Sequence, residues 1–297
     1  MTYVFCPWNE VFRDKGPAIY DEPEYTMRFF MKLKLEGKKA LVTGSSTGIG
    51  ESIAKTLAGE GVQVMVNGRK EKELQRVVDE IKKSGGKADY VVGDLSKNDE
   101  AKHVADKTLD KFGSVDILIN NAGGYPQRDW NNTKPEDWLD LYNTNVVSAV
   151  RMINHLLPQM KKKGWGRIIQ LGSCVGIRPF SSMADYAATK AVHINMSVSL
   201  ALELAGTGIT VNTVSPGPIV TQGVEVLWKG IAKEKGWSQN WAEIEKKVMT
   251  EVIPTPIPRF GLPEEVAAAV VFLASPLANY ITATNLRVDG GVVGTVN

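Results

Sequence analysis

The sequence predicts an α/β fold, in which a parallel sheet is covered by helices on both of its faces. Three observations support this prediction. Short apolar runs alternate with longer amphipathic stretches from Lys39 onward, as in repeated strand–helix units. A glycine-rich turn at residues 43–50 joins the first apolar run to the first amphipathic stretch. Polar residues follow several later runs, at the edge where open α/β sheets bind ligands.

The expected strands are the short apolar runs, each bounded by polar or glycine residues. In chain order they are 40–42, 62–66, 88–92, 115–119, 168–171, 209–214 and 285–288. The longer stretches between them are amphipathic and predict helices. These helices are expected at 50–60, 71–83, 98–112, 135–162, 182–205 and 263–274. Pro135 lies near the start of its helix, where proline is tolerated. Without a composition break, residues 31–297 are expected to form a single domain.

Composition narrows the class of protein. The chain has 297 residues, a 43% hydrophobic share and a net charge of +2, which gives no reason to expect binding to nucleic acid or to an anionic membrane. No apolar run approaches the length of a membrane span. Two cysteines make no disulfide framework, and reduced thiols in the cytoplasm are the default expectation.

The first thirty residues differ from the rest of the chain. They are rich in aromatic side chains, contain three prolines and lack the features of a signal peptide. Because this segment is too apolar for a typical disordered tail, we expect residues 1–30 to form an arm that packs on the body or on a neighbouring subunit. An upstream extension without function is the alternative.

Three polar residues are spaced so that they can form a catalytic group. Tyr186 and Lys190 are four residues apart, and Ser173 precedes the tyrosine by thirteen. A helix beginning near Ser182 places Tyr186 and Lys190 one turn apart on one face, and the preceding strand delivers Ser173 at its carboxyl end. An ammonium group beside a phenol lowers the phenol's pKa from about 10, which suits general acid–base catalysis. Taken alone, such a tyrosine–lysine pair is usually a surface pair.

The turn at residues 43–50 reads Thr-Gly-Ser-Ser-Thr-Gly-Ile-Gly. Gly44, Gly48 and Gly50 allow a tight turn, close approach of the backbone to a pyrophosphate and close packing of helix on strand. The helix that begins here offers unpaired N–H groups and the positive end of its dipole to phosphate. A glycine-rich loop alone is a weak signal, but its position between a strand and a helix predicts dinucleotide binding.

The end of the second strand indicates which dinucleotide binds. An acidic residue here would receive the adenosine ribose of NAD, but the chain has Gly68 and Arg69 at this point. Gly68 leaves room and Arg69 brings a cation, which suits the 2′-phosphate of NADP(H). Ser45 and Thr47 are expected to add hydroxyl donors. The alternative is that Arg69 merely begins a helix and that NAD(H) is the cofactor.

Two more strand ends carry residues suited to the same crevice. Asp94 and Leu95 follow the third strand, and residues 120–123, Asn-Asn-Ala-Gly, follow the fourth. We expect Asp94 to accept a hydrogen bond from the adenine amino group, and the small Ala122 and Gly123 to let the cofactor pack against backbone. Each pattern alone would be an ordinary turn after a strand.

Together these motifs resemble the short-chain dehydrogenase/reductase family, in its common single-domain, 3-oxoacyl reductase-like form. The resemblance extends from about Leu35 to Val292, and its motifs occur in the family's order. They are residues 43–50, residues 120–123, Asn145, Ser173, Tyr186-Ala-Ala-Thr-Lys190 and residues 216–221. The resemblance implies a Rossmann fold with a seven-stranded parallel sheet, and a homotetramer or homodimer.

The resemblance also implies roles for single residues. Tyr186 is the implied general acid–base group, Lys190 lowers its pKa and holds the nicotinamide ribose, and Ser173 orients the substrate carbonyl. Asn145 is implied to hold a water that relays protons to Lys190, and Thr221 to bind the nicotinamide carboxamide. The cofactor-binding residues expected in total are Gly44, Ser45, Thr47, Gly48, Ile49, Gly50, Arg69, Asp94, Leu95, Asn121, Ala122, Gly123, Tyr186, Lys190, Pro216, Gly217, Ile219 and Thr221.

One position departs from the family's pattern. Members that prefer NADP(H) often carry Lys or Arg just before the second glycine of the turn, where this chain has Thr47. The expected preference for the 2′-phosphate therefore rests mainly on Arg69.

The segment between Thr221 and Pro263 departs from the strand–helix rhythm and is expected to be a substrate lid, at about residues 222–262. It reads as two short helices, 223–234 and 240–252, followed by a proline-rich stretch. Its tryptophans either line an apolar pocket or bury the lid against the body or a partner subunit; they are Trp228, Trp237 and Trp241. Further expected wall residues are Tyr125, Trp130, Val175, Ile177 and Met183. Because no arginine is placed for a substrate carboxylate, a largely apolar ketone or 3-oxoacyl group is expected.

The remaining residues of interest have structural interpretations. His103, His155 and His193 are scattered and lack metal-ligand spacing, so no catalytic metal is expected. Cys174 is expected to be a small packing residue.

The expected function is therefore reversible hydride transfer between NADP(H) and a ketone or secondary alcohol. One alternative is an NAD-linked alcohol dehydrogenase of the same family. Another is a non-catalytic NADP-sensing or scaffold protein, which would have no need of Ser173, Tyr186 and Lys190 together.

Overall fold

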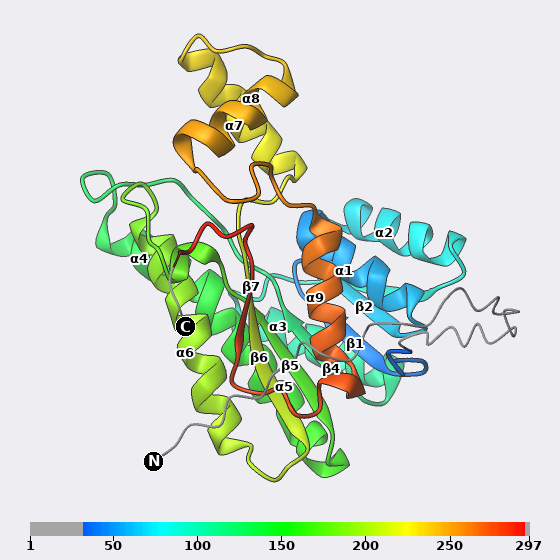
Figure 1. Ribbon diagram of the computed structural model, residues 1–297. Coiled ribbons are helices and arrows are strands. Elements are labelled where there is room, and N and C mark those ends of the chain that lie inside the picture. Colours follow the sequence, from blue (N-terminus) through cyan, green and yellow to red (C-terminus); the bar gives the residue numbers. More distant parts are fainter. Residues whose placement is uncertain (1–31, 295–297) are drawn as a thin grey trace, which may run out of the picture. The chain divides into compact units, whose positions relative to one another are not determined.

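The computed structural model describes residues 32–294, whose strands and helices alternate along the chain (Figure 1). Their seven strands form one parallel sheet in the order β3-β2-β1-β4-β5-β6-β7. The strands are β1 Lys39–Val42, β2 Gln63–Gly68, β3 Lys87–Val92, β4 Ile117–Asn120, β5 Gly166–Leu171, β6 Ile209–Pro216 and β7 Asn285–Val288. The predicted Rossmann-type α/β fold is confirmed. The expected arm, residues 1–30, lies outside the described residues.

The strands read as apolar runs because the sheet is buried on both faces. Every residue of β4, β5 and β6 is buried. The chain turns from one half of the sheet to the other beside β1, which pairs with β2 on one side and β4 on the other. A crevice opens outside the carboxyl ends of strands at such a reversal of order.

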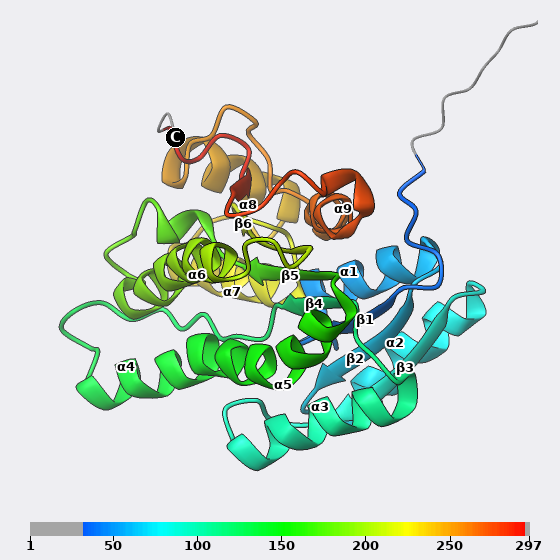
Figure 2. The ribbon, with the colours of Figure 1, turned by 90° about the horizontal axis from the view of Figure 1, so that it is seen from below.

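Helices cover both faces of the sheet (Figure 2). Residues of α1, α2 and α9 pack into one apolar core, and residues of α3, α5 and α6 into a second core on the opposite face. Figure 2 shows α3 and α5 on one side of the sheet and α9 on the other. The helices are α1 Gly48–Gly59, α2 Glu71–Lys83, α3 Asn98–Phe112, α4 Pro135–Tyr142, α5 Ser148–Lys163, α6 Ala184–Glu203, α7 Gln222–Glu234, α8 Trp241–Lys247 and α9 Pro263–Ala274.

The helix expected at residues 135–162 is interrupted, which corrects the prediction of one continuous helix. A π-helical turn, Asn143–Val147, separates α4 from α5. Its central Asn145 is fully buried, and its side chain bonds to Gly124 and Thr189 outside the helix. Single π-helical turns inside α-helices are frequent at functional sites. The periodicity of apolar residues does not reveal this turn, because the residues on both sides of it are helical.

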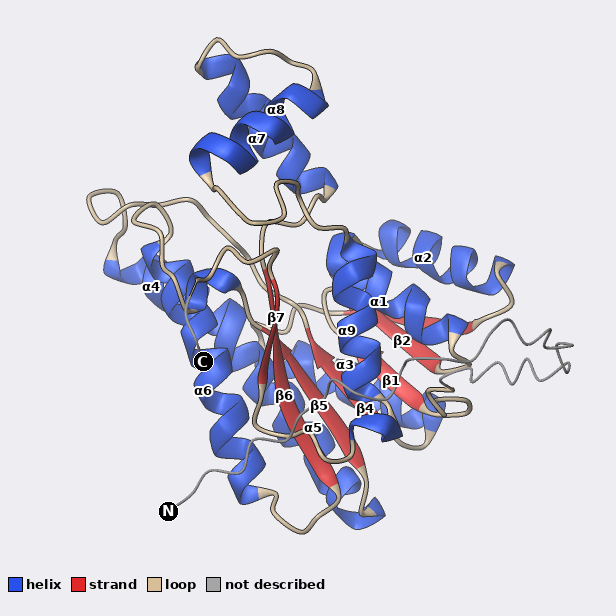
Figure 3. Cartoon of the chain, viewed as in Figure 1, coloured by secondary structure: helices blue, strands red, loops and turns tan. Residues whose placement is uncertain are grey.

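The lid follows the carboxyl end of β6, and its helices α7 and α8 stand beyond the edge of the sheet (Figures 1 and 3). A π-helical turn, Val248–Val252, continues α8. The lid has its own small apolar core, to which Ile244, Met249 and Phe260 belong. Among the helices of residues 32–294, none combines the length and the apolar character needed to span a bilayer.

Candidate functional site

A cleft of about 690 Å³ lies between the carboxyl ends of the strands and the lid. It brings together residues that are far apart in the sequence. Of the predicted site residues, the cleft is lined by Gly44, Thr47, Gly48, Ile49, Gly50, Asn121, Gly123, Ser173, Tyr186, Lys190, Pro216, Gly217, Ile219 and Thr221. The predicted residues outside this lining are Ser45, Arg69, Asp94, Leu95, Ala122 and Asn145.

The glycine-rich turn is joined to the loop after β4. Asn121 donates two side-chain hydrogen bonds, to the carbonyl oxygens of Thr43 and Gly44, each 2.9 Å long. Gly44 has φ of 61°, and a Cβ on it would lie 2.7 Å from Cα of Ala122. A Cβ on Gly50 would lie 2.5 Å from the carbonyl oxygen of Gly44. Both positions therefore require glycine, one for its backbone conformation and both for space.

The hydroxyl of Ser45 does not face the cleft, which corrects its predicted role as a phosphate donor. This hydroxyl is buried, donates to the carbonyl oxygen of Val42 at 2.6 Å and accepts from the N–H of Asn67. Sequence reasoning missed the next residue, Ser46, whose Oγ would lie 3.3 Å from a Cβ on Gly68. The two serines are adjacent in the sequence, so spacing alone could not tell which hydroxyl faces the end of β2.

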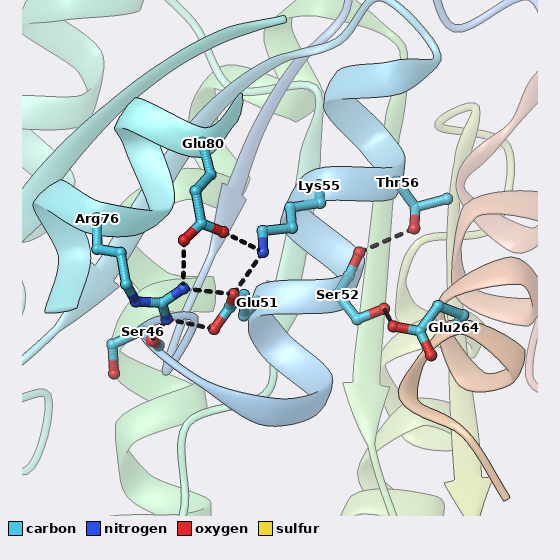
Figure 4. A network of polar contacts seen from close by, with 8 residues as sticks. All are labelled: Ser46, Glu51, Ser52, Lys55, Thr56, Arg76, Glu80 and Glu264. Carbon is cyan, nitrogen blue, oxygen red and sulfur yellow. Dashed lines mark hydrogen bonds and ion pairs between the residues drawn. The ribbon is translucent and has the colours of Figure 1, made fainter. Parts of the chain in front are cut away.

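A network of charges ties α1 to α2 beside this turn (Figure 4). Glu51, in the first turn of α1, pairs with Arg76 at 2.6 Å and with Lys55 at 2.5 Å. Arg76 also donates to the carbonyl oxygen of Ser46 and pairs with Glu80. Burial opposes the charge of Glu51, but the hydrogen bonds from Arg76 and Lys55 hold its pKa below the usual value. The two cations offset a negative charge that would otherwise repel phosphate at the start of α1.

Arg69 differs from Arg76 in being uncommitted. It is exposed just after β2, and among residues 32–294 no carboxylate lies within ion-pair distance of it. It acts at longer range on Asp94: burial opposes the charge of that carboxylate, but bonds from Ser96 and the charge of Arg69 keep its pKa low. Oδ1 of Asp94 accepts two bonds from Ser96. The side chain of Leu95 is buried in the core, so only its backbone can face a ligand.

Ser173, Tyr186 and Lys190 converge on the floor of the cleft. Ser173 ends the turn after β5, and its Oγ accepts from the N–H of Val175 at 3.4 Å. Tyr186 lies in the first turn of α6, and Nζ of Lys190 is 5.6 Å from the centroid of its ring. Nζ of Lys190 donates to the carbonyl oxygen of Leu171 at 2.6 Å, which directs the amine toward the end of β5.

Burial dominates the electrostatics of this floor. It raises the pKa of the Tyr186 hydroxyl, against a lowering by the hydrogen bond with Ser173. It also lowers the pKa of Lys190 to about 8. We expected the charge of Lys190 to lower the pKa of Tyr186, and the structure shows the opposite direction for that pKa. The reason is that desolvation disfavours both the phenolate and the ammonium, so the tyrosine is held in its protonated form.

Asn145 acts through its side chain as a structural link. Its Oδ1 accepts from the N–H of Gly124 at 2.8 Å, and its Nδ2 donates to the carbonyl oxygen of Gly124 and to Oγ1 of Thr189, both at 3.0 Å. A Cβ on Gly123 would lie 3.0 Å from the same Oδ1. Both N–H groups of its amide are therefore used within the protein.

Three other predicted cofactor residues stabilise the loops around the cleft. The N–H of Ala122 donates to Oγ1 of Thr43. Thr221 caps α7 by accepting from the N–H of Val224. A Cβ on Gly217 would lie 2.7 Å from Cα of Asp289, so only glycine fits between β6 and the turn after β7.

The lid forms the apolar wall of the cleft, and one of its three tryptophans belongs to this wall. Trp228 lines the cleft, whereas Trp237 and Trp241 pack in the lid core, and the ring of Trp241 lies 5.4 Å from that of Phe260. Tyr125, Val175 and Met183 line the cleft as predicted. Two expected wall residues do not: Ile177 packs beneath the floor, and Trp130 is 70% exposed and stacks on Trp138.

Cys174 lines the cleft beside Ser173, and its side chain is buried. Burial raises the pKa of the Cys174 thiol to about 11, which leaves it a packing residue rather than a nucleophile. Within residues 32–294, no group of three His, Cys, Asp or Glu side chains is arranged to hold a metal ion.

Comparison with known proteins decides the family. A family model described as short chain dehydrogenase matches residues 38–231. The chain belongs to the short-chain dehydrogenase family. The resemblance inferred from the motifs is thereby confirmed, and the cleft lies where the motifs of this short-chain dehydrogenase meet.

Similar proteins include reductases that are named for different substrates. The chain is 40% identical over 257 residues to the 3-oxoacyl-(acyl-carrier-protein) reductase FabG of Staphylococcus epidermidis, covering 86% of this chain and 98% of FabG. It is 40% identical over 265 residues to the uncharacterized oxidoreductase YvrD of Bacillus subtilis, covering 89% of this chain and 99% of YvrD. The structure of L-sorbose reductase from Gluconobacter frateurii with NADPH and L-sorbose matches with a TM-score of 0.85 and 32% identity, covering 90% of this chain and 100% of that one.

Proposed function

We propose that this short-chain dehydrogenase is an NADP(H)-dependent carbonyl reductase that acts on uncharged, largely apolar ketones. One observation carries the proposal: Ser173, Tyr186 and Lys190 meet on the floor of a cleft that also includes the start of α1 and the apolar wall of the lid. A dinucleotide and a ketone can therefore be held in one cleft beside the same three side chains.

The residues present fit NADP(H). The N-terminus of α1, with Gly48, Ile49 and Gly50 at the cleft, suits the pyrophosphate. Arg69 is exposed and has no ion pair among residues 32–294, and Ser46 lies beside Gly68. This pair suits a 2′-phosphate, for which arginine gives charge-assisted bonds. The structure of L-sorbose reductase in complex with NADPH supports this choice. When bound, the cofactor supplies a hydride to the carbonyl carbon.

The protein's own residues would then handle the proton. Ser173 donates a hydrogen bond to the ketone oxygen and orients it. Tyr186 gives its proton to the same oxygen, so that a secondary alcohol forms. Because burial raises the pKa of Tyr186, the phenol is protonated at neutral pH, as the reducing direction requires. Proton transfer leaves a phenolate on Tyr186, and the ammonium group of Lys190 stabilises this negative charge.

The lining of the cleft supports an uncharged substrate. Of the lining residues that the structure describes, Lys190 alone carries a formal charge, and it is buried and bonded to Leu171. Toward the lid the wall is apolar, and it includes Val224, Leu227 and Trp228. A carboxylate or phosphate on the substrate would be desolvated here without a partner, which is strongly unfavourable. The 3-oxoacyl reductase name of FabG supports 3-oxoacyl esters as the first substrates to test.

We further propose a homotetramer or homodimer in the cytoplasm. Leu139 and Tyr142, on α4, and Leu202, on α6, are large apolar side chains exposed by 71%, 44% and 72%, and a contact with a second subunit would bury such side chains. Light scattering after size-exclusion chromatography tests the assembly, and cell fractionation tests the location.

A panel of ketones followed at the NADPH absorbance band tests the proposed activity. We expect a 3-oxoacyl ester to be reduced with NADPH, more slowly with NADH, and a 3-oxo acid carrying a free carboxylate to be reduced poorly. Faster reduction with NADH would favour the NAD-linked alternative. NADPH binding without reduction of any ketone would favour the non-catalytic alternative.

A further inference from the structure

The loop between β4 and α4, residues 121–134, forms one side of the substrate end of the cleft. Gly124, Tyr125 and Gln127 of this loop line the cleft. Tyr125 is 47% exposed and lies close enough to Tyr186 to affect its pKa. Where this loop sits relative to Tyr186 therefore decides how much room a substrate has beside the catalytic hydroxyl.

Arg128 fastens this loop to the two helices beside it. Its guanidinium pairs with Asp137, in the first turn of α4, and with Asp185, in the first turn of α6. Nη2 lies 3.1 Å from Oδ2 of Asp185, as an ion pair without the alignment of a hydrogen bond. The backbone of Arg128 also pairs with that of Met183 in an isolated parallel bridge.

Asp185 immediately precedes the catalytic tyrosine. Its side chain is 1% exposed, and its Oδ1 accepts from the N–H of Tyr186 at 2.8 Å. One buried carboxylate thus contacts the guanidinium of the loop through one oxygen and the backbone of Tyr186 through the other. Among residues 32–294, Arg128 is the only cation within ion-pair distance of it.

We propose that Arg128 and Asp185 are positioning residues, which set the loop at 121–134 against Tyr186 and so determine the fit of the ketone. The proposal rests on the proposed function, because it concerns the substrate end of that same cleft. Neither residue touches the reacting atoms. Their effect is on where Tyr125 and Gln127 lie relative to the tyrosine hydroxyl.

A purely structural role makes a different prediction. A buried carboxylate that loses its cation destabilises the fold. If the ion pair had only this role, its removal would lower the folded fraction and leave KM unchanged. A positioning role moves KM for the ketone in protein that is fully folded, more for a bulky ketone than for a small one, and leaves NADPH affinity unchanged.

The test uses the full chain with Arg128→Gln, Asp185→Asn and the double variant. Asp185→Asn keeps an acceptor for the N–H of Tyr186 and removes the charge. Lys161→Gln is the matched control, because Lys161 and Glu203 form an exposed pair on the far ends of α5 and α6. Hydrogen–deuterium exchange of residues 121–134 is measured without substrate. KM and kcat are measured for ethyl 3-oxobutanoate and for the bulkier ethyl 3-oxo-3-phenylpropanoate.

We expect each single variant to raise exchange in the loop, and to raise KM for the phenyl ester by about tenfold with kcat changed far less. NADPH affinity and the control should match wild type. The double variant should be no worse than Arg128→Gln, and should melt at a higher temperature than it, because the carboxylate is no longer buried without a cation.

Unchanged loop exchange in both single variants would overturn the proposal, as would effects on KM that add in the double variant. The exchange measurement does not depend on turnover. If wild type reduced no ketone, the proposed function would fail while exchange still decided whether the pair holds the loop.

Discussion

The cofactor wall of the cleft, residues 43–50 with 120–123, and the lid, residues 222–262, are held in place by different interactions. The cofactor wall depends on directed hydrogen bonds, such as those from Asn121 to Thr43 and Gly44. The lid depends on apolar packing, with Trp241 against Phe260 and a core that includes Ile244 and Met249. The first kind of contact demands particular residues, and the second demands shape and volume.

This difference explains why only one wall carries a recognisable motif. A side-chain amide that must reach two carbonyl oxygens, and a glycine that must leave space for a carbonyl, each allow almost no substitute. Apolar cores accept many combinations of side chains if their total volume is kept. Substitutions in the lid can therefore reshape the substrate end of the cleft while the cofactor wall is kept.

The largest effect is expected where the two walls meet, at Tyr186. Tyr186→Phe keeps the ring and removes the proton donor, so kcat should fall by roughly 10²–10⁴-fold while NADPH affinity stays within twofold. Tyr280→Phe, at a fully exposed tyrosine, is the control. The measurement is steady-state reduction of a 3-oxoacyl ester together with NADPH fluorescence titration. If Tyr186→Phe retained most of kcat, the hydroxyl would not be the proton donor.

The next effect is expected at Arg69, which lies just after β2 beside the cofactor wall. Removing Arg69 takes away one charge-assisted contact, worth about 1.5–3 kcal/mol, so Arg69→Ala should weaken NADPH by roughly ten- to hundredfold. NADH should change little. Lys70→Ala is the control, since Lys70 is exposed and pairs with Glu73. Equal weakening of both cofactors by Arg69→Ala would contradict the assignment of the 2′-phosphate to this arginine.

The sequence predicted well which strand ends carry the polar residues of the site, because the fold repeats one strand–helix unit. Each apolar run followed by a polar strand end led to the correct edge of the sheet, and Ser173, Tyr186 and Lys190 do meet there. Adjacent residues in tight turns were harder. Spacing could not show that Ser45 faces inward and Ser46 outward, since both belong to one turn of irregular backbone.

Properties that depend on packing were not predictable from spacing. The direction of the pKa of Tyr186 follows from the burial of its hydroxyl in the folded protein, and no motif predicts that burial. The same holds for the three tryptophans of the lid, residues 222–262, of which Trp228 alone lines the cleft. The side chain of Asn145 belongs to a family motif, but its contacts with Gly124 and Thr189 follow from the π-helical turn.

The cofactor wall should tolerate no added methyl group. In Gly50→Ala the new Cβ would lie 2.5 Å from the carbonyl oxygen of Gly44 and 2.9 Å from Cα of Ser45, both backbone atoms that cannot move freely. We expect the free energy of unfolding to fall by about 1–3 kcal/mol, with weaker NADPH binding. Urea unfolding and cofactor titration measure the two effects. If Gly50→Ala unfolded at the urea concentration of wild type, the turn would have room to move away from the added Cβ.

Lys190 is buried on the floor between the two walls, so its titration should make the free energy of unfolding depend on pH. The pKa of Lys190 is lowered from 10.5 to about 8, so between these values the unfolded chain binds more protons than the folded one. Stability of wild type relative to Lys190→Met should therefore rise with pH in this window, by up to about 1.4 kcal/mol per pH unit. Urea unfolding of both proteins at several pH values measures it. Parallel curves would mean that the folded lysine keeps an ordinary pKa.

The smallest effect, of opposite sign, is expected in the lid. Gly230 is exposed inside α7, and a Cβ added there would meet nothing within 4 Å. Alanine loses less backbone entropy on folding than glycine, so Gly230→Ala should raise the free energy of unfolding by about 0.5–1 kcal/mol. Paired with Gly50→Ala, it compares the same chemical change in the two walls by the same urea titration.

If the lid unfolds together with the sheet, the gain appears in the global transition. If the lid opens by itself, the gain appears only in hydrogen exchange of residues 222–234, which would mean that apolar packing leaves the lid free to move while hydrogen bonds hold the cofactor wall still. Destabilisation by Gly230→Ala in both measurements would contradict the assignment of this position to an unstrained, uncovered helix face.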